Sequence, residues 1–375
     1  MRKLWIFISV VLIAIVGIIL IATHTKKEPE IIQIGAILPL TGGDAKLGES
    51  AKKGIELAVR QINDTEGLQK GKLVVLYQDS QGESTKAISA FRKLIISDKV
   101  PVVIGELAST VTLALSPIAE ENHIILLSPT ASSPKISDAG DYVFRICASD
   151  IFEASFMAEF AYNELKYSNI AILYINNDYG VGLKESFQKH FSGLGGSVLA
   201  VEAFEQGATD FKTQLVKIKS KNVQAIYMPG YAAEMGIILR QSKELGTNIQ
   251  FLSSIAMEDP QVIEIAKDAA NGVIYTAYGY DPKRELPVIQ EFVKAFRIAY
   301  GEEPDIYAAL SYDAVKVIAF ALEKAREAVS NEIKNQLYII KDYPGVTGNI
   351  TFDDKGDVTK SITIKVIKNG TFKYY

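Results

Sequence analysis

Residues Val102–Pro134 read VVIGELASTVTLALSPIAEENHIILLSPTASSP and contain two short apolar runs, Val102–Ile104 and Ile124–Leu127. Each run ends in small and hydroxyl residues, and the residues between the runs have the spacing of a helix. In a parallel sheet both polar tips lie at the carboxyl edge, where α/β folds bind their ligands. The hydroxyl clusters contain no strong acid or base. We therefore expect these tips to hold a small anion rather than to transform it.

The composition is that of a globular protein with room for two domains. The chain has 375 residues, of which 48% are hydrophobic and 22% charged, and its net charge is −4. This charge argues against a nucleic-acid surface, which needs a basic patch. The single cysteine, Cys147, excludes an internal disulfide and a multi-cysteine metal site. Its apolar neighbours Phe144 and Ile146 predict a buried, inert thiol.

The N-terminus carries a targeting segment. Arg2 and Lys3 precede Leu4–Ala22, an uncharged run of nineteen residues that can span a bilayer core of about 30 Å. Basic residues before such a run keep the N-terminus in the cytoplasm. We interpret residues 1–29 as a signal anchor plus linker, with a cleaved signal peptide as the alternative. Both interpretations place the rest of the chain outside the cytoplasm.

Strand-like and helix-like segments then alternate almost without interruption. The order repeats from Ile31 to Ala277 and is followed by long helices predicted near Pro287–Tyr300 and Asp305–Ala328. A terminal hairpin is expected, in which residues 351–353 and 362–367 flank the turn at 354–357. Repeated β-α-β-α order predicts a parallel sheet covered on both faces. The fold class is therefore α/β, with two doubly wound parallel-sheet lobes.

No catalytic signature is present in the sequence. The patterns GxxxxGK[ST], HExxH, GxSxG and CxxC are all missing, and Gly180-Val181-Gly182 lacks the third glycine of a dinucleotide fingerprint. The histidines, His24, His123 and His190, are far apart, which favours surface or capping roles. We therefore predict no enzyme activity and no cofactor.

An acidic turn near the C-terminus is the remaining candidate for a metal site. Asp353, Asp354 and Asp357 surround Gly356 in a stretch too short for a calcium loop. A glycine at this point suits a tight turn. We predict a turn here and no metal site anywhere in the chain.

Five strand tips together define the candidate ligand site. They are Thr41–Gly43, Ser109, Thr130–Ser133, Tyr179 and Tyr231. Tips from two lobes converge if their carboxyl edges face one another. Ser109 precedes a helix, so its hydroxyl and the helix N-terminus can share a carboxylate. The two tyrosines offer flat surfaces and hydroxyls that suit closing on a ligand.

Several stretches of the chain resemble the periplasmic-binding-protein type I family, most closely its branched-chain amino-acid-binding branch. The matching stretches, in order, are Gly48–Asn63 (GESAKKGIELAVRQIN), Ile104–Ser109 (IGELAS), Ser128–Pro134 (SPTASSP), Asp178–Gly182 (DYGVG), Gly230–Glu234 (GYAAE), Gly236–Arg240 (GIILR) and Phe352–Val358 (FDDKGDV). The similarity covers nearly the whole chain after the N-terminal segment.

The resemblance implies two α/β lobes joined by three crossovers. Lobe 1 would comprise residues 30–148 and 279–361, and lobe 2 residues 149–278 and 362–375. The chain would cross near Cys147–Asp150, near Ala277–Tyr280 and near Ser361–Thr363.

The resemblance also implies roles for individual residues. Ser109 and the backbone of Ser132 would hold a ligand carboxylate. The Thr130 carbonyl and the Ser132 hydroxyl would meet an α-ammonium group, and Leu107 would touch the ligand side chain. The two tyrosines of the second lobe would close over the ligand.

Two positions depart from the family pattern. Amino-acid binders of this family usually carry an acid where this chain has Ile255, and an aromatic residue where it has Leu47. An ammonium buried without a counter-charge costs several kcal/mol. Glu258 or Asp259 could replace the missing acid if the loop is shifted.

We therefore predict an extracytoplasmic solute-binding protein of an ABC importer. Two lobes would close on a small carboxylate, most simply a branched-chain or other apolar amino acid, and deliver it to a permease served by separate ATPase chains. Three alternatives stay open: a sensory ectodomain, a binder of an amine-free aliphatic or aromatic carboxylate, and, as the least favoured, an amidohydrolase on a similar fold. With Ile255 in place of the family's acid, a carboxylate with an apolar tail and no amine fits as well as leucine or valine does.

Overall fold

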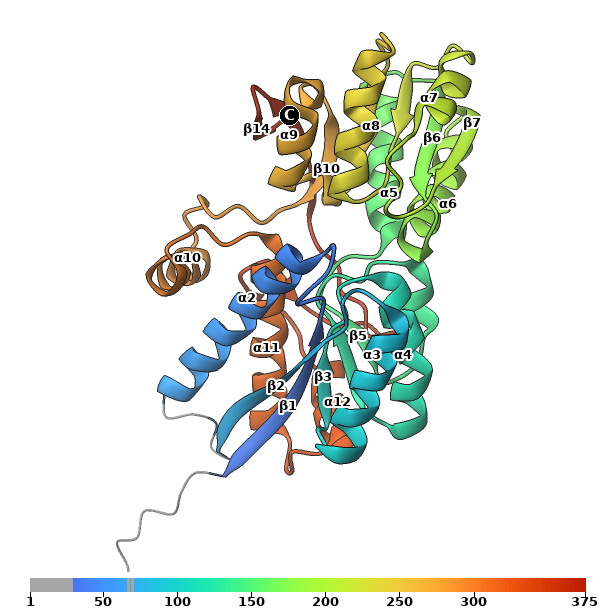
Figure 1. The fold of residues 1–375 in the computed structure, drawn as a ribbon. Coiled ribbons are helices and arrows are strands. Elements are labelled where there is room, and N and C mark those ends of the chain that lie inside the picture. The colour runs from blue at the N-terminus through green and yellow to red at the C-terminus, as the bar shows by residue number, and fades with distance from the viewer. Residues whose placement is uncertain (1–29, 66–67, 69–70) are drawn as a thin grey trace, which may run out of the picture.

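The computed structural model describes residues 30–65, 68 and 71–375. The predicted membrane segment, Leu4–Ala22, lies outside these residues. No helix among the described residues is long and apolar enough to cross a membrane. The described chain forms two lobes, one above the other in Figure 1.

The first lobe is built on a parallel sheet with the strand order β2-β1-β3-β4-β5. Its strands are β1 (Ile31–Leu38), β2 (Lys72–Asp79), β3 (Val102–Ile104), β4 (Ile125–Ser128) and β5 (Val143–Arg145). Its helices are α2 (Ala45–Asp64), α3 (Ser84–Arg92), α4 (Ser109–Asn122), α10 (Pro287–Tyr300), α11 (Ile306–Lys324) and α12 (Ser330–Tyr338). In β1, Ile34 and Ala36 pack with α2 and α11, whereas Ile37 packs with α3 and α4. Both faces of the sheet are therefore covered, which explains the continuous apolar runs in the sequence.

The second lobe has a sheet with the order β14-β13-β10-β9-β8-β6-β7. Its strands are β6 (Asn169–Ile175), β7 (Ser197–Phe204), β8 (Ala225–Tyr227), β9 (Gln250–Ser253), β10 (Ile274–Tyr278), β13 (Ile362–Lys368) and β14 (Thr371–Tyr374). Its helices are α5 (Asp150–Glu159), α6 (Asp178–Gly193), α7 (Lys212–Lys219), α8 (Ala232–Glu244) and α9 (Pro260–Ala266). Strands β6 to β10 are parallel to one another, and β13 and β14 extend the sheet in antiparallel fashion beyond β10.

The five parallel strands of each lobe follow the same winding. In each, the first strand of the lobe lies between the second and the third. Such an order creates a switch point where the loops after neighbouring strands diverge, and ligands bind there. The predicted α/β class with two doubly wound lobes is confirmed.

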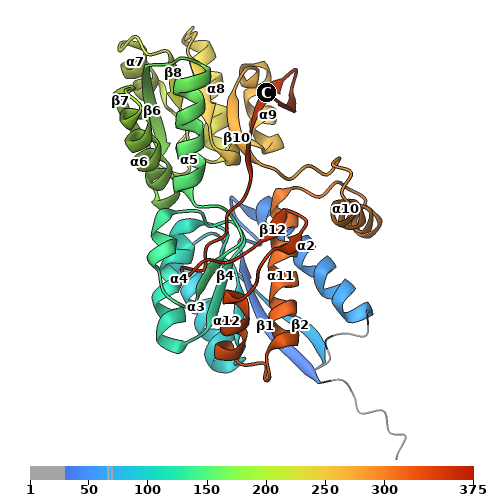
Figure 2. The ribbon, with the colours of Figure 1, turned by 180° about the vertical axis from the view of Figure 1, so that it is seen from behind.

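The predicted terminal hairpin is wrong in its pairing. The turn itself forms, because Phe352 bridges Val358 and the backbone N–H of Asp353 donates to the carbonyl of Asp357 at 2.9 Å. The strand β13, however, leaves the first lobe and pairs with β10 and β14 of the second (Figure 2). An alternating strand pattern specifies which face is buried but not which strand is the neighbour.

Three further elements were not predicted from the sequence. They are α12, the small hairpin of β11 (Tyr343–Gly345) and β12 (Gly348–Ile350), and the last strand, β14. The helix predicted over 305–328 also ends earlier, at Lys324. All are short or peripheral, so they carry few periodic apolar residues.

Each lobe has its own core. One cluster of buried residues draws on segments 32–148 and 278–358, and another on 154–277 and 364–367. The division into lobe 1 (residues 30–148 and 279–361) and lobe 2 (residues 149–278 and 362–375) stays a prediction.

Candidate ligand-binding site

A pocket of about 750 Å³, counted out to its opening, lies between the two lobes. All six residues predicted to bind the ligand line it: Leu107, Ser109, Thr130, Ser132, Tyr179 and Tyr231. They follow strands β3, β4, β6 and β8, so the carboxyl edges of both sheets meet at this pocket. The structure brings the six together, and their individual roles stay predictions.

The first-lobe wall of the pocket is made of hydroxyl and backbone groups. Ser109 is the first residue of α4, and its Oγ accepts hydrogen bonds from the N–H groups of Ser132 (3.2 Å) and Ser133 (3.1 Å). The hydroxyl of Thr130 donates to the carbonyl of Leu107 at 2.9 Å. These bonds hold the loops after β3 and β4 together, so their polar groups are positioned before a ligand arrives.

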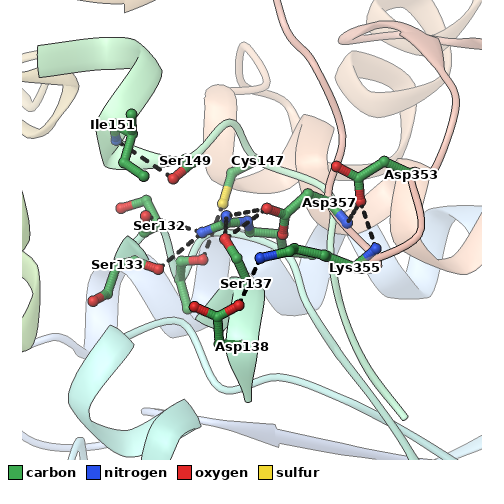
Figure 3. A network of polar contacts seen from close by, with 12 residues as sticks. Ser132, Ser133, Ser137, Asp138, Cys147, Ser149, Ile151, Asp353, Lys355 and Asp357 are labelled. Carbon is green, nitrogen blue, oxygen red and sulfur yellow. Dashed lines mark hydrogen bonds and ion pairs between the residues drawn. The ribbon is translucent and has the colours of Figure 1, made fainter. Parts of the chain in front are cut away.

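Arg145 fixes the loop after β4 from behind. Its guanidinium is fully buried and donates to the carbonyls of Ser132 and Ser133, each at 3.0 Å. It also forms an ion pair with Asp357 at 2.6 Å and donates to Ser137 (Figure 3). The acidic turn is therefore a support for the loop: its Asp357 holds the cation that binds the loop's carbonyls.

The predicted thiol environment is confirmed in the same region. Cys147 is buried and free, and its Sγ donates to the carbonyl of Ala131 at 3.3 Å. Burial raises the pKa of this thiol to about 12, which keeps it protonated and unreactive.

The second-lobe wall is aromatic. The rings of Tyr179 and Tyr231 stack with centroids 5.6 Å apart and planes at 3°. The hydroxyl of Tyr179 pairs with the Ser254 hydroxyl at 2.7 Å, and Asn177 Nδ2 donates to the Tyr231 hydroxyl at 3.3 Å. Both rings are thus held in place by neighbours of their own lobe.

The two positions that depart from the family pattern also line the pocket. Ile255 and Leu47 contribute apolar surface. Neither of the acids considered as replacements lines it. Glu258 pairs with Lys365 at 2.5 Å, and the Asp259 carboxylate accepts from the N–H of Gln261 at the start of α9.

Two lining acids were missed by the sequence reasoning, Asp44 and Glu106. Glu106 is fully buried, accepts from the Ser80 hydroxyl (2.8 Å) and from the N–H of Ala108 (2.7 Å), and has its pKa raised by burial to about 7. Burial also raises the pKa of Asp44, with Glu234 adding to the effect. Among the described lining residues there is no Lys, Arg or His, so a ligand anion would be bound by dipoles rather than by a cation.

A polar contact joins the lobes beside the pocket. Asp178, at the start of α6, accepts from the Thr110 hydroxyl at 2.9 Å and pairs with Lys135 at 2.8 Å. Nearby, a Cβ at Gly182 would lie 2.6 Å from Pro134 Cδ, so a glycine is needed for α6 to approach the first lobe. The Gly180-Val181-Gly182 stretch therefore serves helix packing.

Comparisons with known proteins agree with this architecture. A family model described as periplasmic binding protein matches residues 31–371. A Leu/Ile/Val-binding protein homologue of Brucella abortus is 31% identical over 327 residues, 87% of each chain. The leucine-binding protein LivK of Thermotoga maritima superposes with a TM-score of 0.86 at 33% identity, covering 92% of this chain and 97% of that one. LivJ of Streptococcus pneumoniae, solved with isoleucine, has a TM-score of 0.85 at 29% identity, covering 92% and 98%.

The match extends over both lobes and includes the loops that form the pocket. By their names, LivJ is the substrate-binding protein of a branched-chain amino-acid transporter, and a relative from Pseudomonas aeruginosa, 29% identical over 331 residues, binds leucine, isoleucine, valine, threonine and alanine. This chain belongs to the periplasmic binding protein family and is an extracytoplasmic solute-binding protein of an ABC transporter.

Proposed function

We propose that the solute is a small carboxylate with an apolar body, and that leucine, isoleucine and valine are the first candidates. The observation that carries this is the pocket itself, which has hydroxyl and N–H groups on one wall and aromatic and aliphatic surface on the other. The names of the similar proteins, which bind these amino acids, support the choice.

In this proposal the carboxylate lies against the first-lobe wall. The Ser109 hydroxyl has its hydrogen free for a ligand, because its oxygen already accepts from two N–H groups. Ser109 is also the first residue of α4, and the N-terminus of a helix of this length favours a negative charge. The Ser132 hydroxyl and the Thr130 carbonyl meet an ammonium group in this proposal, and Leu107 contacts the side chain of the ligand.

The second lobe closes the site in this proposal. Tyr179 and Tyr231 cover the ligand, and the contact of Asp178 with Thr110 and Lys135 forms as the lobes approach. A ligand that touches both lobes shifts the population toward the closed state, which the permease then recognises. Binding rather than catalysis is supported by the lining residues, which combine no nucleophile with a neighbouring base.

An amine-free carboxylate is the second candidate. Ile255 favours it, because this side chain brings apolar surface to the wall where family members usually carry an acid. The two candidates differ in one chemical group, so a matched pair of ligands separates them.

Titration calorimetry of the full-length chain tests the proposal. We expect saturable binding, one ligand per chain, by at least one of L-leucine, L-isoleucine, L-valine and 4-methylpentanoate. Absence of binding by all four would contradict the proposed ligand class.

We also propose that residues 4–22 anchor the protein in the membrane. The length of the apolar run and the basic residues before it support this. N-terminal sequencing of the protein isolated from membranes should find the segment intact. A mature N-terminus shortly after residue 22 would instead establish a cleaved signal peptide.

A further inference from the structure

Glu153 is a buried acid, and one of its carboxyl oxygens has no hydrogen-bond partner. It lies in the first turn of α5 and is 1% exposed. Its Oε1 accepts from the N–H of Ile255 at 2.8 Å and from the Thr276 hydroxyl at 2.5 Å. Its Oε2 is buried without a hydrogen-bond partner.

No cation among the described residues forms an ion pair with Glu153. The nearby buried cation, Arg145, is paired with Asp357 and with the loop after β4. The neighbouring Asp150 is also fully buried, and burial together with the charge of Glu153 raises its pKa well above the usual value, whereas Ser132 and Arg145 work in the opposite direction. Burial raises the pKa of Glu153 above its usual range, although its two hydrogen bonds work in the opposite direction. A buried carboxyl without a counter-charge is costly to ionise, so a cation placed near Glu153 would stabilise its charged form.

Glu153 lies one layer behind the second-lobe wall of the pocket. The residue whose N–H it binds, Ile255, lines the pocket. The next residue toward the strand, Ser254, is bonded to the hydroxyl of Tyr179, which lines the pocket as well. Burial raises the pKa of Tyr179, and the negative charge of Glu153 adds to this effect, as expected for groups that feel each other's field. A positive group placed against this wall would feel the same field.

We propose that Glu153, which is hydrogen-bonded to the backbone of Ile255 behind the second-lobe wall, supplies the counter-charge for an ammonium group of the ligand. This rests on the proposed function, in which the carboxylate occupies the first-lobe wall. A charge need not touch its partner in a poorly screened interior, because the Coulomb attraction there extends over several ångströms. The apolar Ile255 then excludes water from the ammonium and leaves the field of Glu153 unscreened. The ammonium in turn provides the positive charge that the buried carboxylate lacks.

A matched pair of ligands tests the proposal on the full-length chain. L-Leucine and 4-methylpentanoate share the carboxylate and the branched tail and differ in the amine. The wild-type chain should bind L-leucine at least tenfold more tightly than 4-methylpentanoate. Equal affinities, or tighter binding of 4-methylpentanoate, would overturn the proposal without touching the carboxylate site.

The variant Glu153→Gln keeps the shape of the side chain and an oxygen that can accept from Ile255 and Thr276. It should lower the L-leucine affinity at least tenfold and leave the 4-methylpentanoate affinity within twofold of wild type. An equal loss for both ligands would show a merely structural role and overturn the proposal. Glu159→Gln, at an exposed position on the same helix, is the control and should change neither affinity.

A second variant restores the charge at another position. Glu153→Gln combined with Ile255→Glu places the acid in the wall itself and should recover the preference for L-leucine. Failure to recover it in a folded double variant would count against a charge-based role. Absence of binding by L-leucine, L-isoleucine, L-valine and 4-methylpentanoate alike in the wild type would instead contradict the proposed function as a whole.

Discussion

The two walls of the pocket differ in the ionisable residues buried behind them. The first-lobe wall presents hydroxyl and N–H groups and has a buried cation, Arg145, behind it. The second-lobe wall presents tyrosine and isoleucine and has buried acids, Asp150 and Glu153, behind it. Charges of both signs are thus placed one layer away from the ligand. A zwitterion would find hydroxyl and N–H groups, apolar surface and the lining acids Asp44 and Glu106 at contact distance, with the fields of Arg145 and of the second-lobe acids behind them.

The largest expected effect comes from replacing Glu106, a buried acid of the first-lobe wall. Burial raises the pKa of Glu106 from 4.5 to about 7. Folding therefore favours its protonated form, and the stability from this group is present below its usual pKa and lost as pH rises to about 7. Glu106→Gln should become more stable relative to wild type by about 2–3 kcal/mol between pH 5 and pH 8.

Urea unfolding at the two pH values measures this difference. A stability difference between variant and wild type that does not change with pH would show that Glu106 is ionised throughout. In that case the wall that receives the carboxylate would itself be negative, and the contrast between the walls would fail.

Tyr231 is part of the aromatic second-lobe wall. Its ring stacks on Tyr179 and lines the pocket, so Tyr231→Ala removes contact area from the closed state. We expect a loss of at least about 2 kcal/mol of ligand affinity and a smaller ligand-induced change in the scattering profile. Tyr231→Phe, which removes only the hydrogen bond from Asn177, is the control and should retain closure. Wild-type compaction in Tyr231→Ala would remove this residue from the closing mechanism.

Ser109 is part of the polar first-lobe wall. Ser109→Ala removes a donor to the ligand and leaves the N–H groups of Ser132 and Ser133 without their acceptor. We expect about 1–2 kcal/mol less affinity and a similar loss of folding stability. Calorimetric titration and thermal unfolding measure the two effects separately. Unchanged affinity alongside lowered stability would reduce Ser109 to a structural role.

The contact beside the pocket should have the smallest effect. Burial of Asp178 would raise its pKa, but hydrogen bonds from Lys135 and Thr110 outweigh this and lower the pKa below its usual value. The contact is therefore present at neutral pH and is lost only as pH falls through that lowered pKa. Because the pair is partly exposed, Asp178→Asn should cost about 0.5 kcal/mol of ligand affinity at pH 7. A loss as large as that for Tyr231→Ala would make this contact a main determinant of closure.

The sequence predicted the polar tips of the site better than the charges behind them. Ser109, Thr130 and Tyr179 follow apolar runs directly, so the edge of a parallel sheet had to bring them together. Glu153 lies within a helix, and only the folded chain shows that it reaches the N–H of Ile255. No pattern in one sequence marks such a contact between segments about a hundred residues apart.

The same limit explains the wrong hairpin. The alternation in Ile362–Ile367 correctly predicted a strand, but the pairing with β10 depends on a chain crossing between lobes. The role of Arg145 could not be predicted from the sequence either, because its partner Asp357 is brought close only by the turn at 353–357.

In the proposed function, the pocket binds its ligand by the carboxylate. A thermal-shift comparison of the full-length chain with L-leucine, 4-methylpentanoate and 3-methylbutylamine tests it most directly, because these share a branched tail and differ in the charged groups. A ligand at a hundredfold excess over its Kd adds about 2.7 kcal/mol of stability. We expect stabilisation by at least one of the two carboxylates and none by the amine. Stabilisation by 3-methylbutylamine equal to that by L-leucine would contradict it.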